Sequence, residues 1–100
     1  MDKNLLPTLG LARRAGKLLL GVASIQSYPR SVELLIIASD ASPRVTRALA
    51  GRKESSVVSE LTKVELGHAV GCKQTAVIAV TDAGFAGAIR KKMELQEENV

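Results

Sequence analysis

A helix, a short strand and the start of a second helix follow one another in the segment Leu9-Gly10-Leu11-Ala12-Arg13-Arg14-Ala15-Gly16-Lys17-Leu18-Leu19-Leu20-Gly21. Gly16 is placed to end the first helix, and Arg13 and Arg14 lie in its last turn, where cations favour the helix dipole. The apolar run that follows is typical of a buried strand. The turn at Gly21 could offer free backbone N–H groups to phosphate. The segment therefore predicts part of a layered fold and a cationic site beside it.

The same alternation of helix and strand continues along the chain. The run Val32–Ala38 is almost entirely apolar, which suits a central strand covered on both faces. Thr62-Lys63-Val64-Glu65 has the form of a capping box, with Leu61 and Leu66 at the hydrophobic-staple positions. The predicted helices span residues 5–15, 21–28, 42–51, 62–71 and 81–93, and the predicted strands span 17–20, 32–38, 55–61 and 75–80.

This order predicts one α/β domain over residues 1–100, with a mostly parallel sheet between layers of helices. Either Thr81 or Asp82 caps the last helix, in which Phe85, Ile89 and Met93 recur every fourth residue. Beyond Met93 the sequence becomes acidic, so residues 94–100 are expected to form a frayed tail.

The composition favours a polyanionic partner. The net charge is +4, and three of the ten acidic residues are Glu94, Glu97 and Glu98. The rest of the chain has 14 basic and 7 acidic residues, a net charge of +7. A generic basic protein is the alternative. Tyr28 and Phe85 are the only aromatic residues, which argues against RNA modules that stack bases on aromatic rings, such as the RRM.

Other classes of protein find little support in the sequence. Cys72 is the only cysteine, which excludes an intramolecular disulfide and a cysteine-rich zinc site. The glycines form no nucleotide-binding pattern, and we expect no cofactor. The sequence shows neither a signal peptide nor an apolar run of membrane-spanning length. We therefore expect a cytoplasmic protein without a membrane partner.

Four motifs occur in a specific order and spacing over nearly the whole chain. They are Leu9-Gly10-Leu11-Ala12-Arg13-Arg14-Ala15-Gly16-Lys17, Ala38-Ser39-Asp40-Ala41-Ser42, Glu65-Leu66-Gly67-His68-Ala69-Val70-Gly71 and Ala79-Val80-Thr81-Asp82-Ala83-Gly84-Phe85-Ala86. Together they resemble the bacterial YlxQ-type members of the ribosomal protein L-seven-Ae / L-thirty-e family, many of which bind kink-turn RNA.

The resemblance implies a three-layer α/β/α sandwich with a four-stranded mixed, mostly parallel sheet, whose fourth strand is antiparallel to the others. It also implies a non-enzymatic RNA-binding protein of the ribosome or the translation machinery, with structured RNA, rRNA among the candidates, and ribosomal or translation-factor proteins as partners. By this resemblance RNA contacts come from residues 21–27, 38–43 and 71–75. The RNA-binding candidates are Arg13, Arg14, Lys17, Gly21, Ala23, Ser24, Ser27, Asp40, Cys72 and Lys73.

The chain departs from the kink-turn signature Gly-x-Asn-Glu-x-x-Lys. Gly21 is retained, but Ala23, Ser24 and Ser27 replace the asparagine, the glutamate and the lysine. Each lost base contact would weaken discrimination by about 1–3 kcal/mol. Gln26 lies one position from the lysine, about 100° around the helix, and does not replace it. These differences predict weak or altered recognition of kink-turn RNA.

Several residues have a structural as well as a functional interpretation. Arg13, Arg14 and Lys17 either compensate the dipole at a helix end or contact phosphate. We expect His68 to face solvent, Cys72 to be an ordinary loop cysteine, and Asp40 and Asp82 to act in caps or turns rather than in catalysis. The alternative to RNA binding is a protein-interaction module that kept this fold and lost specific RNA recognition.

Overall fold

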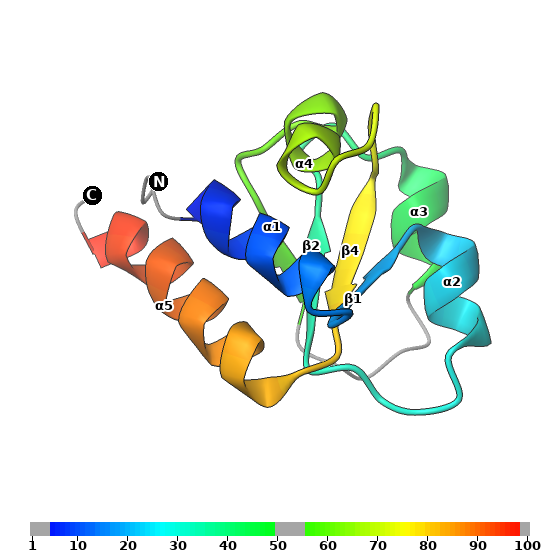
Figure 1. Cartoon of the computed structure of the whole chain (residues 1–100). Helices are drawn as coiled ribbons and strands as arrows, with labels where there is room; N and C mark the ends of the chain where they lie inside the picture. The colour runs from blue at the N-terminus through cyan, green and yellow to red at the C-terminus, as the bar shows by residue number, and fades with distance from the viewer. Residues whose placement is uncertain (1–4, 50–55, 99–100) are drawn as a thin grey trace.

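The computed structural model describes residues 5–49 and 56–98 (Figure 1). Helices and strands alternate along these residues. In chain order they are α1 (Leu5–Arg14), β1 (Leu18–Leu20), α2 (Val22–Ser27), β2 (Leu34–Ile37), α3 (Pro43–Ala48), β3 (Ser56–Val58), α4 (Lys63–Ala69), β4 (Val77–Val80) and α5 (Ala83–Glu98). The predicted order of elements is confirmed. The helix end expected at Gly51 lies outside the described residues.

The four strands form one mixed sheet in the order β1-β4-β2-β3. β4 is antiparallel to both of its neighbours: Leu18 pairs with Val80 on one side, and Leu34 pairs with Val80 on the other. Only β2 and β3 pair in parallel, with Leu35 opposite Ser56. The four-stranded mixed sheet and the antiparallel fourth strand are therefore confirmed. The prediction of a mostly parallel sheet is wrong, because one strand pairing out of three is parallel.

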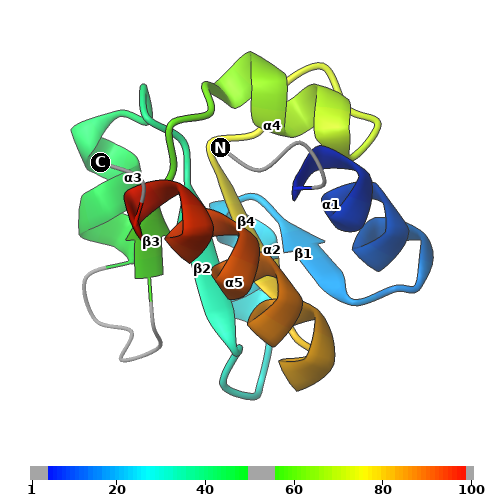
Figure 2. The same cartoon turned by 90° about the vertical axis from the view of Figure 1, so that its left-hand side faces the viewer.

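The short helix α4 explains the reversed direction of β4. A parallel β4 would require the chain to return to the opposite end of the sheet. α4 has seven residues, about 10 Å of helix, and both views show it lying across the end of the sheet at which β2 finishes (Figures 1 and 2). The Ala38 amide donates to the Ala76 carbonyl at that same end, 2.8 Å away. The chain thus enters β4 where β2 ends and must run back antiparallel to it.

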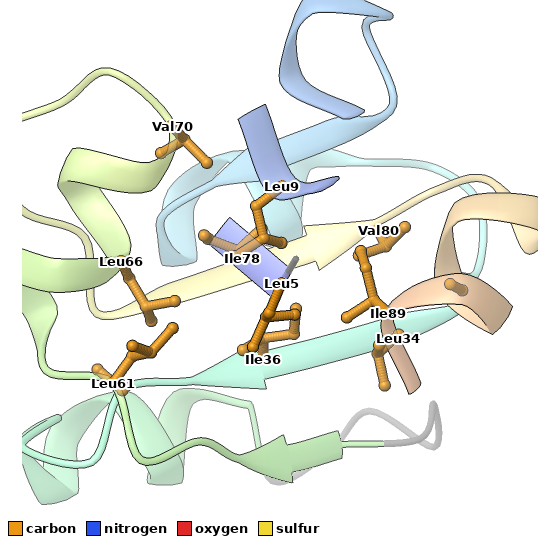
Figure 3. Packing of buried hydrophobic residues seen from close by; sticks show 12 residues of the cluster. Leu5, Leu9, Leu34, Ile36, Leu61, Leu66, Val70, Ile78, Val80 and Ile89 are labelled. Atoms are coloured by element: carbon orange, nitrogen blue, oxygen red, sulfur yellow. The ribbon is translucent and has the colours of Figure 1, made fainter. Parts of the chain in front are cut away.

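Helices cover both faces of the sheet, and the side chains of β2 alternate between them. Leu34 and Ile36 pack in the cluster formed with α1, α4 and α5 (Figure 3), whereas Leu35 and Ile37 pack in the cluster formed with α2. All four residues of β2 are buried. The prediction of a central strand covered on both faces is confirmed. The apolar run therefore has the length and burial that a three-layer arrangement requires.

The local end signals act as predicted at three helices. Gly16 and Gly71 follow α1 and α4 with φ of 75° and 81°, a left-handed conformation that glycine adopts without a Cβ clash. The capping box at α4 is complete: the Glu65 amide donates to Thr62 Oγ1 at 3.2 Å, and the Thr62 amide donates to Glu65 Oε1 at 2.9 Å. Asp82, rather than Thr81, caps α5, because its Oδ2 accepts from the Phe85 amide at 2.9 Å.

α5 continues to Glu98, beyond the end that we expected near Met93. The expected end is wrong because Glu, Leu and Gln are good helix formers, so intrinsic propensity extends the helix past its last apolar repeat. Whether this acidic segment frays in solution stays a prediction.

Candidate nucleic-acid interface

Three segments that are far apart in sequence meet at one end of the sheet. We call this end the loop edge and define it by Gly21, residues 38–43 and residues 71–76. The Gly21 amide donates to the Val77 carbonyl at 3.0 Å, and the Ala38 amide donates to the Ala76 carbonyl at 2.8 Å. The end of β1, the end of β2 and the start of β4 are thus tied together. These are the three segments from which the resemblance predicts RNA contacts.

The first segment presents small side chains to solvent. Gly21 has φ of 85° and is the N-cap of α2, and Ala23 and Ser24 are exposed in the first turn. The other polar groups of α2 have partners within the protein. Ser27 Oγ donates to the Ala23 carbonyl of its own helix at 2.9 Å, and Gln26 Nε2 donates to the Ala48 carbonyl of α3 at 3.1 Å. Gln26 therefore joins α2 to α3, which agrees with the prediction that it does not replace the family's lysine.

The second segment is joined to α4 through Asp40. Its Oδ1 accepts from the Lys63 amide, the first of α4, at 2.8 Å. This carboxylate satisfies a helix-end donor that has no partner inside the helix. The interpretation of Asp40 as a capping residue is confirmed, although it caps a helix 23 residues further along the chain. Its position also fixes the distance between residues 38–43 and α4.

The third segment lies alongside α4. The Cys72 amide donates to the Gly67 carbonyl at 2.7 Å, and the Thr75 amide donates to the Lys63 carbonyl at 3.0 Å. The contact is close: a Cβ built on Gly67 would lie 2.5 Å from Gln74 Cα. Lys73, between these anchored residues, is exposed. The backbone of this segment is therefore held in place while the Lys73 side chain faces solvent.

Two cations that sequence reasoning missed join Lys73 at the loop edge. Arg44 is exposed in the first turn of α3, directly after residues 38–43, and Lys63 is half-buried at the first position of α4. The first turn of a helix favours acids, and a cation there costs up to about 1 kcal/mol. Basic residues at two adjacent helix starts therefore do not serve helix stability. A basic residue in the first turn of a predicted helix is therefore the signal by which the sequence could have indicated Arg44 and Lys63.

Arg13 bridges two helices. Its Nη1 donates to the Val70 carbonyl at 2.5 Å and contacts Cys72 Sγ at 3.3 Å. Val70 is the C-cap of α4, so the guanidinium lies at the negative end of that helix dipole as well as in the last turn of α1. The structural interpretation of Arg13 is confirmed, with α4 as an additional partner. The predicted phosphate contact stays a prediction.

Arg14 and Lys17 are exposed, and Lys17 lies apart from the loop edge. The Lys17 carbonyl accepts from the Thr81 amide at 2.9 Å and from Thr81 Oγ1 at 3.1 Å. It thus lies where β1 begins and β4 ends, opposite the end that contains Gly21. The four residue steps from Lys17 to Gly21 span about 13 Å along a strand. The structure therefore brings together Gly21, Asp40, Cys72 and Lys73 but leaves Lys17 at the other end of the sheet.

Other chemistry finds no support among the described residues. No group of three His, Cys, Asp or Glu side chains in 5–49 and 56–98 could hold a metal ion. His68 is exposed, as predicted. Within the same residues, no helix is both long enough and apolar enough to cross a bilayer.

The similar proteins that comparison finds are solved structures. No protein-family profile and no curated protein matches the chain. A protein with unknown function from Bacillus halodurans is 30% identical; the match covers 94% of this chain and 99% of that one, with a TM-score of 0.70. A 15.5-kD RNA-binding protein from Giardia lamblia is 22% identical, with coverage of 92% and 86% and a TM-score of 0.66. The second likeness shows a shared fold.

Proposed function

This chain belongs to the same family as the protein with unknown function from Bacillus halodurans, and from this premise we propose that it is a non-enzymatic RNA-binding protein. The observation that carries the proposal is the loop edge, where hydrogen bonds tie together the segments that contain or adjoin Arg44, Lys63 and Lys73. The fold it shares with an RNA-binding protein from Giardia lamblia supports the same function. The sequence motifs further support a place among the YlxQ-type relatives of ribosomal protein L-seven-Ae / L-thirty-e.

RNA phosphates contact the cations of the loop edge in this proposal. Three phosphate contacts correspond to a slope of about −2.7 in log K against log salt, so affinity falls about 40-fold between roughly 50 and 200 mM salt. Arg13, Arg14 and Lys17 extend the cationic surface at the end of α1. Because Arg13 also holds α4 and Cys72, its contribution includes positioning the segment that contains Lys73.

Recognition of kink-turn RNA is weakened in this protein. Ala23 has no hydrogen-bonding side chain, Ser24 lacks the reach and charge of glutamate, and the Ser27 hydroxyl donates within its own helix. Replacement of the two base-reading residues removes about 2–6 kcal/mol of discrimination against the wrong bases. A nanomolar, sequence-dependent kink-turn complex in a gel-shift titration at physiological salt would contradict this proposal.

The cellular role that follows is association with the ribosome or with translation, with structured RNA, including rRNA, as the ligand class. RNA crosslinked to the protein in cell lysate and recovered in a salt-dependent manner would support it. A protein partner that remains after nuclease treatment, with no crosslinked RNA, would instead favour the alternative of a protein-interaction module. The replaced base-reading positions Ala23 and Ser24 are the observation that favours this alternative.

Two triple variants with equal charge loss test where RNA binds. The first replaces Arg44, Lys63 and Lys73 by glutamine. The second replaces Arg14, Lys17 and Lys91, which are exposed outside the loop edge. We expect the first variant to reduce the magnitude of the slope of log K against log salt by about 2–3, and the second variant to change this slope less. An equal or larger change in the second variant would move the phosphate contacts to the end of α1.

A further inference from the structure

The loop edge combines cations with a surface of very short side chains, and this combination restricts the form of RNA that it can bind. Gly21 belongs to it and Ala23 and Ser24 are exposed in the turn that follows, whereas the longer polar side chain of Gln26 donates to the Ala48 carbonyl of α3. Long polar side chains that could reach a base edge are therefore absent from the described first turn of α2. In this turn, direct reading of base sequence would require such side chains.

Stacking on aromatic rings is also excluded as a means of binding. The whole sequence has two aromatic residues. Phe85 packs against the cluster formed with α1, α4 and α5, and Tyr28 packs against the cluster formed with α2. Proteins that bind single-stranded RNA without base-specific contacts depend on aromatic platforms for much of their affinity. This protein has none to offer at the loop edge.

The backbone segments that contain the three cations of the loop edge are instead tied to one another. Asp40 ties residues 38–43, and with them the start of α3 that contains Arg44, to the amide of Lys63. The Lys63 carbonyl in turn accepts from the Thr75 amide, two residues after Lys73. Because the backbones are fixed, a ligand with regularly spaced phosphates can contact all three cations without a cost for ordering the protein backbone.

We infer that the ligand is double-helical RNA bound through its backbone, independently of sequence, with the small surface at Gly21, Ala23 and Ser24 lying against the shallow minor groove. This inference rests on the proposed RNA-binding function. A-form RNA presents 2′-hydroxyls and phosphates across a wide, shallow minor groove and is recognised chiefly by its shape. The exposed Ser24 hydroxyl can donate to or accept from a 2′-hydroxyl.

Fluorescence anisotropy with three RNA probes tests the ligand class. The probes are two duplexes of unrelated sequence and one single strand of the first duplex, titrated at the same salt concentration. We expect the two duplexes to bind equally within about threefold, because phosphate contacts contain no sequence information. The single strand should bind at least about tenfold more weakly, because the protein offers its bases no aromatic side chains on which to stack.

The possible results separate this inference from the proposal on which it rests. If none of the RNA probes binds, the RNA-binding function itself fails. If the single strand binds as well as the duplexes, or if the duplexes differ strongly, RNA binding stands and the inference of a backbone-bound duplex is wrong.

A matched pair of variants tests the position of the duplex. Ala23→Glu and Ala83→Glu each place an acid in the exposed first turn of a helix, where it favours the dipole. Ala83 lies at the opposite end of the sheet, after β4. We expect Ala23→Glu to weaken duplex binding at least about tenfold through repulsion of phosphate, and Ala83→Glu to change it by less than about twofold.

Ala23→Asp, a shorter acid at the same exposed position, repeats the test should Ala23→Glu fail to fold by circular dichroism. Duplex affinity equal to that of the unmodified protein in a folded variant would overturn the placement.

Discussion

The close approach of α4 to residues 73–74 makes Gly67 a sensitive position. A Cβ at Gly67 would lie 2.5 Å from Gln74 Cα, 2.6 Å from Gln74 N and 2.9 Å from Lys73 C. Carbon atoms in favourable contact are about 3.5–4.0 Å apart. All three atoms belong to the backbone, so no side-chain rotation can relieve the overlap. Gly67→Ala must therefore push the segment that contains Lys73 away from α4.

The cost follows from the contacts that hold this segment. Overpacking costs about 1–3 kcal/mol. Displacement also strains the hydrogen bonds from the Cys72 and Thr75 amides to α4, and the loss of one of them adds about 1 kcal/mol. The higher helix propensity of alanine relative to glycine offsets about 1 kcal/mol of this loss of stability. We therefore expect Gly67→Ala to lower the free energy of unfolding by about 1–3 kcal/mol; at about 2 kcal/mol, the Tm falls by about 8–16 °C.

Gly87→Ala is the matched control for this experiment. Gly87 is exposed in α5, and a Cβ there meets nothing within 4 Å, so the substitution should raise stability by up to about 1 kcal/mol. Urea and thermal unfolding of both variants, followed by circular dichroism, measure the two effects. A Gly67→Ala protein as stable as the unmodified chain, beside a stabilised Gly87→Ala, would refute the close packing of α4 against residues 73–74.

The remaining predictions concern the ends of α4. Thr62→Ala removes the hydroxyl that accepts from the Glu65 amide and should lower the free energy of unfolding by about 1 kcal/mol, measured by urea denaturation; no change would argue against the capping box in solution. Arg13→Gln breaks the bond to the Val70 carbonyl and should cost about 1 kcal/mol, whereas Arg14→Gln should stay within about 0.5 kcal/mol. Equal melting temperatures for these two variants would contradict the bridging role of Arg13.

Much of the fold could be predicted because its signals are local. The capping box at Thr62, the glycine end at Gly16 and the nearly continuous apolar run Val32–Ala38 each depend on residues within a few positions of one another. The end of α5 was missed because propensity alone extends a helix, whereas the prediction relied on apolar periodicity. The antiparallel character of two of the three strand pairings was missed because alternation of helix and strand does not specify which strands become neighbours.

The candidate site was predicted less completely than the fold. The resemblance placed RNA contacts in three segments, and the structure ties those segments together at the loop edge. It also adds Arg44 and Lys63, and it separates Lys17 from Gly21 by the length of β1. The charge of a residue can be read from the sequence, but its distance from another charge depends on the path of the chain through the sheet.

Taken by itself, the sequence determined the order of the helices and strands, that the core is aliphatic, and that the base-reading side chains are replaced at Ala23 and Ser24. Only the tertiary structure decided that β4 lies between β1 and β2, that Asp40 caps α4, and that Arg13 binds the other end of that helix. The physical reason is the range of the interactions. Caps and propensities act within one or two turns, whereas strand order and the partners of Asp40 and Arg13 depend on packing between distant segments.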